Sequence, residues 1–216
     1  MSTDFAKAYA KYSKTASPEL LAKTVKALEA KKHIVKVVKN EKEAQEYLQS
    51  LIPDGSSVSM GGSTTLDQIG FVEEIKKRDD KITNYKGKAV AAMMTGDMAT
   101  YGKLVHQGYL ADTFLSSCSA ISADGDLFVV DMTGSRWGGW ASAGKLVVVT
   151  GSNKLVENEA EAEARIQYQY QLESARVRVA YKIPASQISN KVVMKNVNPM
   201  APPRVHVVII EKSLGF

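Results

Sequence analysis

An uninterrupted apolar run at residues 146–149, Leu-Val-Val-Val, constrains the fold of this 216-residue chain more than any other feature. Such a run is typical of a strand that is buried on both faces of a sheet. Residues 33–38 are also strand-like, and a helix that Asn40 caps separates them from another apolar run at residues 58–60. A strand, helix, strand order favours a parallel sheet with right-handed crossovers. We therefore expect an α/β fold, in which residues 205–210 form the last strand.

The run at residues 58–60 stops at a glycine pair, Gly61 and Gly62, which Ser63 and Thr64 follow. Because glycine lets a ligand approach the main chain and a helix start leaves N–H groups free, this arrangement is typical of a site for phosphate or carboxylate. A tight connection without any ligand would have the same sequence. The sequence leaves both interpretations open.

Polar and glycine residues also follow the other expected strands, at residues 116–119, 131–140 and 151–154. Ligands of an open parallel sheet bind outside the carboxyl ends of its strands, so these loops should meet at one edge. The candidate ligand-binding residues all lie at these strand ends: Gly61, Gly62, Ser63, Thr64, Ser119, Gly134, Ser135, Gly151, Asn153 and Lys154.

Charged residues in the same loops are the candidates for catalysis. We expect Arg136 and Lys154 to neutralise an anionic substrate, and Asp131 or Asp124 to act as an acid or base or to orient a hydroxyl group. The candidate catalytic residues are therefore Asp131, Asp124 and Arg136. An ion pair between Arg136 and Asp131 that only fixes the loop is the alternative.

Several helices have recognisable starts. Ser17 and Pro18 predict the start of one helix, with the hydroxyl as cap and the proline in the first turn. Asn158 and Glu161 resemble a capping box at the start of another, in which Glu161 and Arg165 have the spacing of an ion pair.

A long helix is predicted over residues 89–110, with its methionines filling the core. Residues 123–126, Ala-Asp-Gly-Asp, indicate a hairpin between two short strands. Trp137 and Trp140 flank two glycines, and we expect this loop to be a lid over the pocket or a contact between copies in a homo-oligomer. A buried turn is the alternative.

Composition excludes several classes of protein. The 28 basic and 23 acidic residues are interspersed, with no long basic block, which argues against nucleic-acid binding. Cys118 is the only cysteine, so the chain cannot hold a four-cysteine metal or iron–sulfur site by itself, and a reducing cytoplasm is the expected compartment. No segment has the length and hydropathy of a membrane span, and we expect no metal and no cofactor.

Familiar catalytic motifs are missing. Residues 139–145 have the spacing of a phosphate-binding loop, but Leu146 stands where magnesium needs a hydroxyl residue, and no G-x-G-x-x-G or G-x-S-x-G occurs. Of the three histidines, only His106 is a plausible catalytic residue, because His33 and His206 lie on apolar strands. Cys118 could be a nucleophile, although a lone cysteine is more often a small buried residue.

The motifs at these strand ends together resemble those of the LUD domain, the lactate-utilisation LutC/YkgG family. They are residues 61–66, 111–115 with 120–125, Asp131, residues 134–136, 147–156 and 164–165, and the similarity runs from near Leu20 to Phe216. The resemblance implies a three-layer α/β/α fold with a mainly parallel sheet, similar to the ribose-phosphate isomerase and CoA-transferase superfamily. It also implies one domain over residues 1–216, with residues 1–30 as an N-terminal helical extension.

The family implies less about function. Its members are associated with oxidation of lactate to pyruvate alongside separate iron–sulfur proteins. This chain departs from the family at Ser119 and Ser135, where asparagine is common, and lacks a cysteine-rich stretch between Lys182 and Arg204. A hydroxyl in place of an amide removes a donor and shortens the reach, which can change ligand preference.

We expect a cytoplasmic protein of organic-acid utilisation that binds a small anionic metabolite, bearing phosphate or carboxylate, at the carboxyl edge of its sheet. The first alternative is a non-catalytic subunit that docks on an iron–sulfur electron-transfer partner. The second, an acyl-CoA transferase or sugar-phosphate isomerase, rests on fold analogy, and Glu157 is the only nearby carboxylate for it. The sequence leaves open whether the chain is an enzyme.

Overall fold

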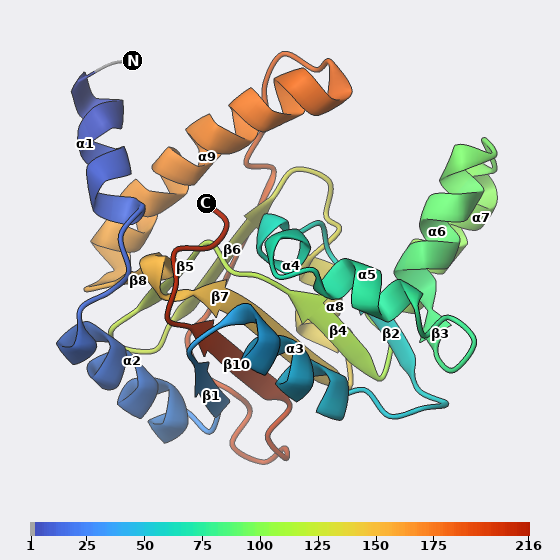
Figure 1. Cartoon of the computed structure of the whole chain (residues 1–216), viewed down its shortest axis with the longest axis horizontal. Coiled ribbons are helices and arrows are strands. Elements are labelled where there is room, and N and C mark those ends of the chain that lie inside the picture. The colour runs from blue at the N-terminus through green and yellow to red at the C-terminus, as the bar shows by residue number, and fades with distance from the viewer. Residues whose placement is uncertain (1–2) are drawn as a thin grey trace.

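The computed structural model describes residues 3–216, which form two β-sheets and their covering helices (Figure 1). The larger sheet has six strands, and every neighbouring pair in it is parallel. In spatial order they are β1 (Ile34–Val38), β10 (Val205–Ile210), β7 (Lys145–Gly151), β4 (Thr113–Ser116), β2 (Ser57–Met60) and β3 (Thr83–Asn84). The strands β7 and β10 lie side by side and are buried along almost their whole length, as the uninterrupted apolar runs predict.

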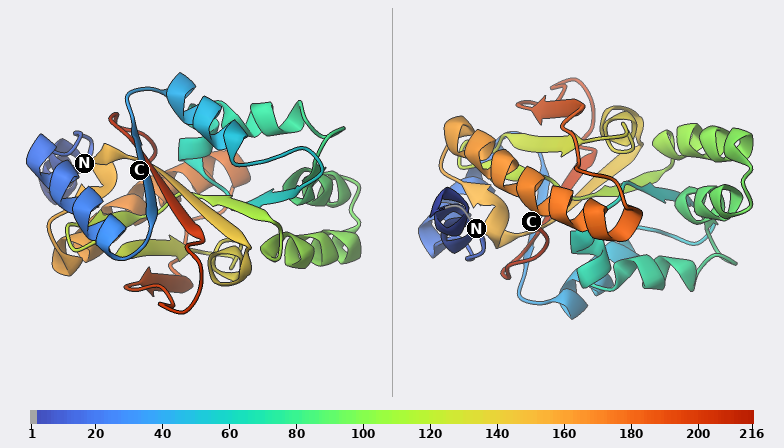
Figure 2. Two further views of the ribbon diagram at one scale, coloured as in Figure 1. Left: turned by 90° about the horizontal axis from the view of Figure 1, so that it is seen from below. Right: turned by 90° about the horizontal axis from the view of Figure 1, so that it is seen from above.

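Helices cover both faces of this sheet (Figure 2). On one face lie α3 (Glu41–Ser50), α4 (Thr64–Gln68) and α5 (Phe71–Lys76), which bury Leu48 and Phe71 against the strands. On the other face, α2 (Pro18–Ala30) and α8 (Trp137–Ser142) contribute Leu28 and Trp140 to a second core cluster. The expected three-layer α/β/α arrangement with a mainly parallel sheet is therefore confirmed.

A second, smaller sheet lies beside the second core cluster. Its strands, in spatial order, are β8 (Leu155–Val156), β5 (Ala120–Ser122), β6 (Leu127–Asp131) and β9 (Asn190–Met194). The expected hairpin between β5 and β6 is confirmed, and Gly125 has the left-handed φ of 77° that its turn requires. The sequence did not predict β9, nor that these strands form a separate sheet.

The outer face of the smaller sheet packs against α9 (Glu159–Tyr181) and α1 (Thr3–Tyr12). Phe128 of β6, Ile166 of α9 and Tyr12 of α1 belong to one buried cluster. The predicted helix caps are present: Ser17 Oγ accepts from the Leu20 N–H at 3.2 Å, and Asn158 Oδ1 accepts from the Glu161 N–H at 2.9 Å. The helix α9 runs past the ends of the larger sheet and forms a wall of the site described below.

The predicted long helix over residues 89–110 is wrong. Two helices, α6 (Tyr85–Met94) and α7 (Met98–Tyr109), form a hairpin beside β2 and β3 (Figure 1). The break occurs at Gly96, whose φ is 79°, and at Asp97, whose carboxylate accepts from the Thr100 N–H and starts α7. The methionines near this break do not fill the core, since Met94 is 81% exposed.

The loop with two tryptophans is a packed helix. Trp140 is 1% exposed and its indole N–H donates to Ser116 Oγ at 2.9 Å, so the expectation of a lid is wrong for this residue. A Cβ on Gly139 would lie 2.4 Å from the ring of Phe114, which means that only glycine lets α8 approach β4 this closely. Trp137 is exposed, and its role in a contact between copies stays a prediction.

Candidate functional site

The carboxyl ends of β2, β4 and β7 meet at the side chain of Lys154. This residue ends a short 3-10 helix (Ser152–Lys154) directly after β7, and it is 3% exposed. Its Nζ donates to Thr65 Oγ1 and Ser117 Oγ, each at 3.1 Å, and to the carbonyl oxygen of Cys118 at 3.3 Å. Thr65 belongs to α4, which follows β2, and Ser117 and Cys118 follow β4. Lys154 therefore lies at the carboxyl ends of the strands, where the sequence predicted a cation.

All three acceptors around the Lys154 amine are uncharged. Burial lowers the pKa of Lys154 from 10.5 to about 7; the positive charges of Arg165 and Arg136 add to this effect, and Cys118 opposes it. A buried lysine next to two arginines is unfavourable unless it loses its proton or gains an anionic partner. The arrangement is therefore suited either to a neutral amine or to a bound anion.

Arg165 of α9 lies in the motif at residues 164–165, but it was not among the predicted site residues. Its side chain is fully buried, and it donates to the carbonyl oxygens of Asn153 and Ser119. Its Nη2 has no hydrogen-bond partner within residues 3–216. The predicted ion pair with Glu161 is wrong, because Glu161 pairs with Lys11 at 2.5 Å. Within the described part of the chain its guanidinium has no salt bridge, and its positive charge helps to lower the pKa of Lys154.

Arg136 supplies the third cation from the smaller sheet. It lies just after β6, and its Nε and Nη2 donate to the carbonyl oxygen of Gly62 at 3.1 and 2.5 Å. Its Nη1 donates to the carbonyl oxygen of Val130 at 2.6 Å. These hydrogen bonds place the guanidinium next to the turn after β2, although its loop follows a strand of the other sheet.

Arg136 also explains one of the two glycines. A Cβ on Gly61 would lie 2.6 Å from Arg136 Cγ, whereas a Cβ on Gly62 would have no atom within 4 Å. Gly61 is therefore required by a side chain of the protein, and the turn at Gly62 is open. Ser63 Oγ accepts from the Leu66 N–H at 3.2 Å and so caps α4, a helix of only 5 residues. The helix start is a weaker anion site than the sequence indicated.

Asp131 fixes the loop that carries Arg136, but not through an ion pair. Its carboxylate accepts from the backbone N–H groups of Gly134 and Arg136, at 2.5 and 3.0 Å, and from the side-chain amide of Asn190 at 3.1 Å. The alternative of an Arg136–Asp131 ion pair is therefore wrong, because the carboxylate does not contact the guanidinium. Asp131 nevertheless fixes the loop, as that alternative expected. Gly134 also accepts from the Tyr109 hydroxyl at 3.1 Å, which holds the loop from a second side.

A cleft of about 470 Å³ opens beside these groups. The residues predicted from the sequence that line it are Gly62, Ser63, Thr64, Asp131, Ser135, Arg136 and Lys154. Thr65, Ser117 and Cys118 line it as well. The structure thus brings the glycine turn and both predicted cations to one cavity.

The far wall of the cleft comes from α9 and the segment after it. Arg176 and Glu173 form a bidentate pair there, with N···O distances of 2.6 and 2.8 Å, so their charges offset each other. Asp67 lines the cleft too, and burial raises its pKa. Gln169 has a buried side-chain oxygen that finds no donor within residues 3–216. Sequence reasoning missed this wall because α9 carries charged residues on all its faces.

Other predicted residues support the cleft from behind. Ser119 Oγ accepts from the Val130 N–H at 3.2 Å, and Asn153 Oδ1 accepts from the Leu214 N–H at 3.0 Å. A Cβ on Gly151 would lie 2.4 Å from Asn153 Oδ1. None of these residues lines the cleft, so their positions favour a structural contribution.

A sequence model of the LUD domain matches residues 21–210. The chain belongs to the LUD domain family. Membership identifies a lactate-utilisation-type domain, and no curated protein matches the chain significantly. A crystal structure of a DUF162 family protein from Deinococcus radiodurans is similar, with a TM-score of 0.52 and 13% sequence identity over 89% of this chain and 96% of that chain. At this identity the similarity shows the fold alone.

In residues 3–216, no helix has the length and apolar character that crossing a membrane requires.

Three sequence candidates of this LUD domain lie away from the cleft. Asp124 is exposed in the turn between β5 and β6. His106 lies on α7 beside the ring of Tyr109, with 6.0 Å between ring centroids. Glu157 has a side chain that is 59% exposed and 3.8 Å from Lys23, so it does not occupy the position that a transferase carboxylate needs. Cys118 lies at the cleft, but burial raises its pKa and keeps it a thiol.

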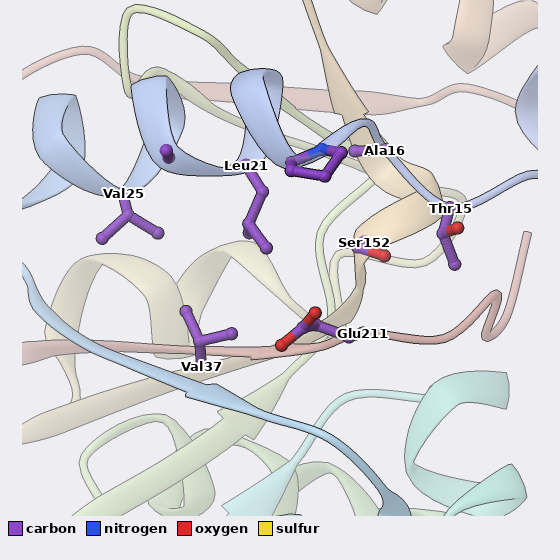
Figure 3. Close-up of a pocket in the computed structure, with 9 residues that line it drawn as sticks. Thr15, Ala16, Leu21, Val25, Val37, Ser152 and Glu211 are labelled. Carbon is purple, nitrogen blue, oxygen red and sulfur yellow. The ribbon is translucent and has the colours of Figure 1, made fainter.

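A second hollow of the LUD domain lies between α2 and the β1 edge of the larger sheet (Figure 3). Leu21 and Val25 of α2 face Val37 across it, and Glu211 is its only charged residue. Glu211 is already paired with Lys39 at 2.6 Å. This hollow therefore offers mainly apolar surface with the hydroxyl groups of Thr15 and Ser152, and no cation among the described residues lines it.

Proposed function

We propose that this LUD domain binds a small organic anion, with a carboxylate or phosphate group, in the cleft beside Lys154 and Arg136, as part of organic-acid utilisation. The observation that carries the proposal is the surroundings of the Lys154 amine, which consist of two hydroxyl groups and a carbonyl. Within residues 3–216 no carboxylate forms a salt bridge with Lys154, Arg136 or Arg165. A bound anion would supply the missing negative charge.

One further polar atom of the cleft favours a polar ligand. Gln169 lines the cleft, and its Oε1 is a buried acceptor without a donor within residues 3–216. Buried polar groups are normally hydrogen-bonded, and exceptions often mark the place of a water molecule or a ligand. A cleft of this size accepts a metabolite of a few carbon atoms together with water.

The proposal is tested by titrating the protein with lactate, pyruvate and inorganic phosphate in a calorimeter. Replacing Arg136 by alanine should weaken binding by roughly tenfold to a hundredfold, because a charge-assisted contact in a desolvated site contributes about 1.5–3 kcal/mol. Asp124→Asn is the matched control, since it also removes one charge from a strand-end loop but lies outside the cleft. Equal affinities of the wild type and Arg136→Ala would contradict the proposal, as would the absence of binding by all three anions.

A second function is favoured by the hairpin of α6 and α7. Its tip exposes Met94 and Met98, which are 81% and 58% exposed, and Met93 beside them lines the cleft. Methionine-rich surfaces are common at protein contacts because the side chain adapts to its partner. We propose that this tip docks on an iron–sulfur electron-transfer protein of lactate oxidation. Met94→Glu should abolish binding to such a purified partner in a pull-down, and Lys88→Glu on the same helix is the control.

A further inference from the structure

The amine of Lys154 is placed to act as a nucleophile. Thr65 Oγ1 and Ser117 Oγ, which hold it, lie 3.2 Å from each other and close a triangle with Nζ. A hydroxyl group both donates and accepts hydrogen bonds, so this triangle accommodates a neutral amine, with its lone pair, as well as an ammonium group. A carboxylate partner would instead hold the lysine in its charged form, which has no lone pair.

A second group fixes what kind of molecule the amine would meet. Arg136 lines the same cleft, and within residues 3–216 its guanidinium donates only to carbonyl oxygens, so it forms no salt bridge. The negative charges of Asp131 and Glu173 act on it without a hydrogen bond to the guanidinium. A guanidinium has five N–H groups, and the three hydrogen bonds to carbonyl oxygens leave one on Nη1 and one on Nη2. Arginine binds carboxylates through such a pair of N–H groups. A ligand with a carboxylate at Arg136 and an electrophilic carbon at Lys154 fits both groups.

We propose that Lys154 forms an imine with the carbonyl carbon of a small 2-oxo carboxylic acid whose carboxylate pairs with Arg136. This inference rests on the anion site proposed above and names the chemical class that it takes. It also assigns Lys154 a covalent role, in addition to its role as a positive charge for the anion. Amines of buried lysines are established nucleophiles toward carbonyl groups.

The step needs no oxidant and no reductant. The lone pair of neutral Nζ attacks the carbonyl carbon, and the carbonyl oxygen takes up a proton while Nζ loses one, which gives a carbinolamine. The carbinolamine then loses its hydroxyl group with a proton as water, and a C=N bond forms between the ligand and Nζ. Thr65 and Ser117 each touch Nζ and each other, so they can pass the proton from nitrogen to oxygen.

The protonation state of the lysine agrees with this chemistry. With a pKa of about 7, a large share of Lys154 is neutral near neutral pH, whereas a lysine at its ordinary 10.5 is almost wholly protonated. Imine formation at Lys154 should therefore speed up through pH 7 and level off about one pH unit above it.

The experiment traps the imine with sodium borohydride, which reduces C=N to a stable secondary amine. The full chain is incubated with pyruvate, the smallest 2-oxo acid with a methyl group, and is then reduced and analysed by peptide mass spectrometry. The expected result is one adduct for each chain, located at Lys154. Lactate, which has no carbonyl group, and acetone, which has no carboxylate, should give no such adduct.

Two variants make the test specific. Lys154→Met should lose the adduct, and Lys86→Met, which removes the other lysine that lines the cleft, should keep it. Mapping the adduct on the wild type remains decisive if Lys154→Met does not fold. An adduct spread over many surface lysines, or none at all, would overturn the imine.

Calorimetry on the same sample separates the two proposals. Binding of pyruvate and lactate without an adduct would overturn the imine and leave the anion site standing. Absence of both binding and adduct would overturn both.

Discussion

Replacing Lys154 by methionine should change how the stability of the protein depends on pH. The side chains are similar in length, but methionine carries no titratable group. At about 1.4 kcal/mol for each unit of pKa, the difference between 10.5 and about 7 sets an upper bound of about 5 kcal/mol on the free energy of burying this charge. Between these two values the unfolded chain holds a proton on Lys154 that the folded protein lacks. Unfolding then takes up a proton, so the wild type becomes more stable as pH rises.

The assay is urea denaturation of the wild type and Lys154→Met at pH 7 and pH 9. With a folded pKa of about 7, the wild type should gain about 2 kcal/mol in free energy of unfolding relative to the variant over this range. Other titrating groups affect both proteins alike and cancel. Lys86→Met is the control and should track the wild type at both values. A difference between wild type and Lys154→Met that stays constant within about 0.5 kcal/mol would refute a neutral lysine in the folded protein.

Two further pairs of substitutions test packing, one at the glycine turn and one in α8. Gly61→Ala should lower the free energy of unfolding by about 1–3 kcal/mol and weaken anion binding, because its Cβ would displace Arg136, while Gly62→Ala should change stability by less than about 0.5 kcal/mol; equal effects in denaturation curves would show that the Arg136 side chain moves aside freely. Trp140→Phe should cost about 1–3 kcal/mol through the lost hydrogen bond to Ser116, and the exposed Trp137→Phe should cost less than about 0.5 kcal/mol. An unchanged thermal unfolding midpoint for Trp140→Phe would rule out the burial of its indole N–H.

The larger sheet could be predicted because its signals are local. The apolar runs of β7 and β10 and the caps Ser17 and Asn158 each express a rule that needs only a few neighbouring residues. Of the smaller sheet only the hairpin of β5 and β6 could be predicted, because β9 pairs with β6 across the whole of α8, β7 and α9. Local composition does not reveal such a partner.

The candidate site divides in the same way. The rule that ligands bind beyond strand ends led to Lys154 and to the turn at Gly62, since both follow strands that the sequence reveals. Arg165 could not be recognised, because its spacing from Glu161 fits an ion pair and its burial depends on how α9 packs. The role of Gly61 was equally hidden, because the side chain that requires it comes from the other sheet.

The contact between Gly61 and Arg136 has a consequence for the evolution of the family. A side chain at position 61 and an arginine at position 136 would occupy the same space, with a Cβ only 2.6 Å from Arg136 Cγ. Relatives that keep the arginine should therefore keep glycine, and those that replace the arginine by a small residue are free to carry a larger one at position 61. The two positions should covary even though they lie after strands of different sheets, Gly61 after β2 and Arg136 after β6. A relative that has lost the arginine and carries a larger residue at position 61 lacks this cation in its cleft. Its ligand should therefore differ in charge.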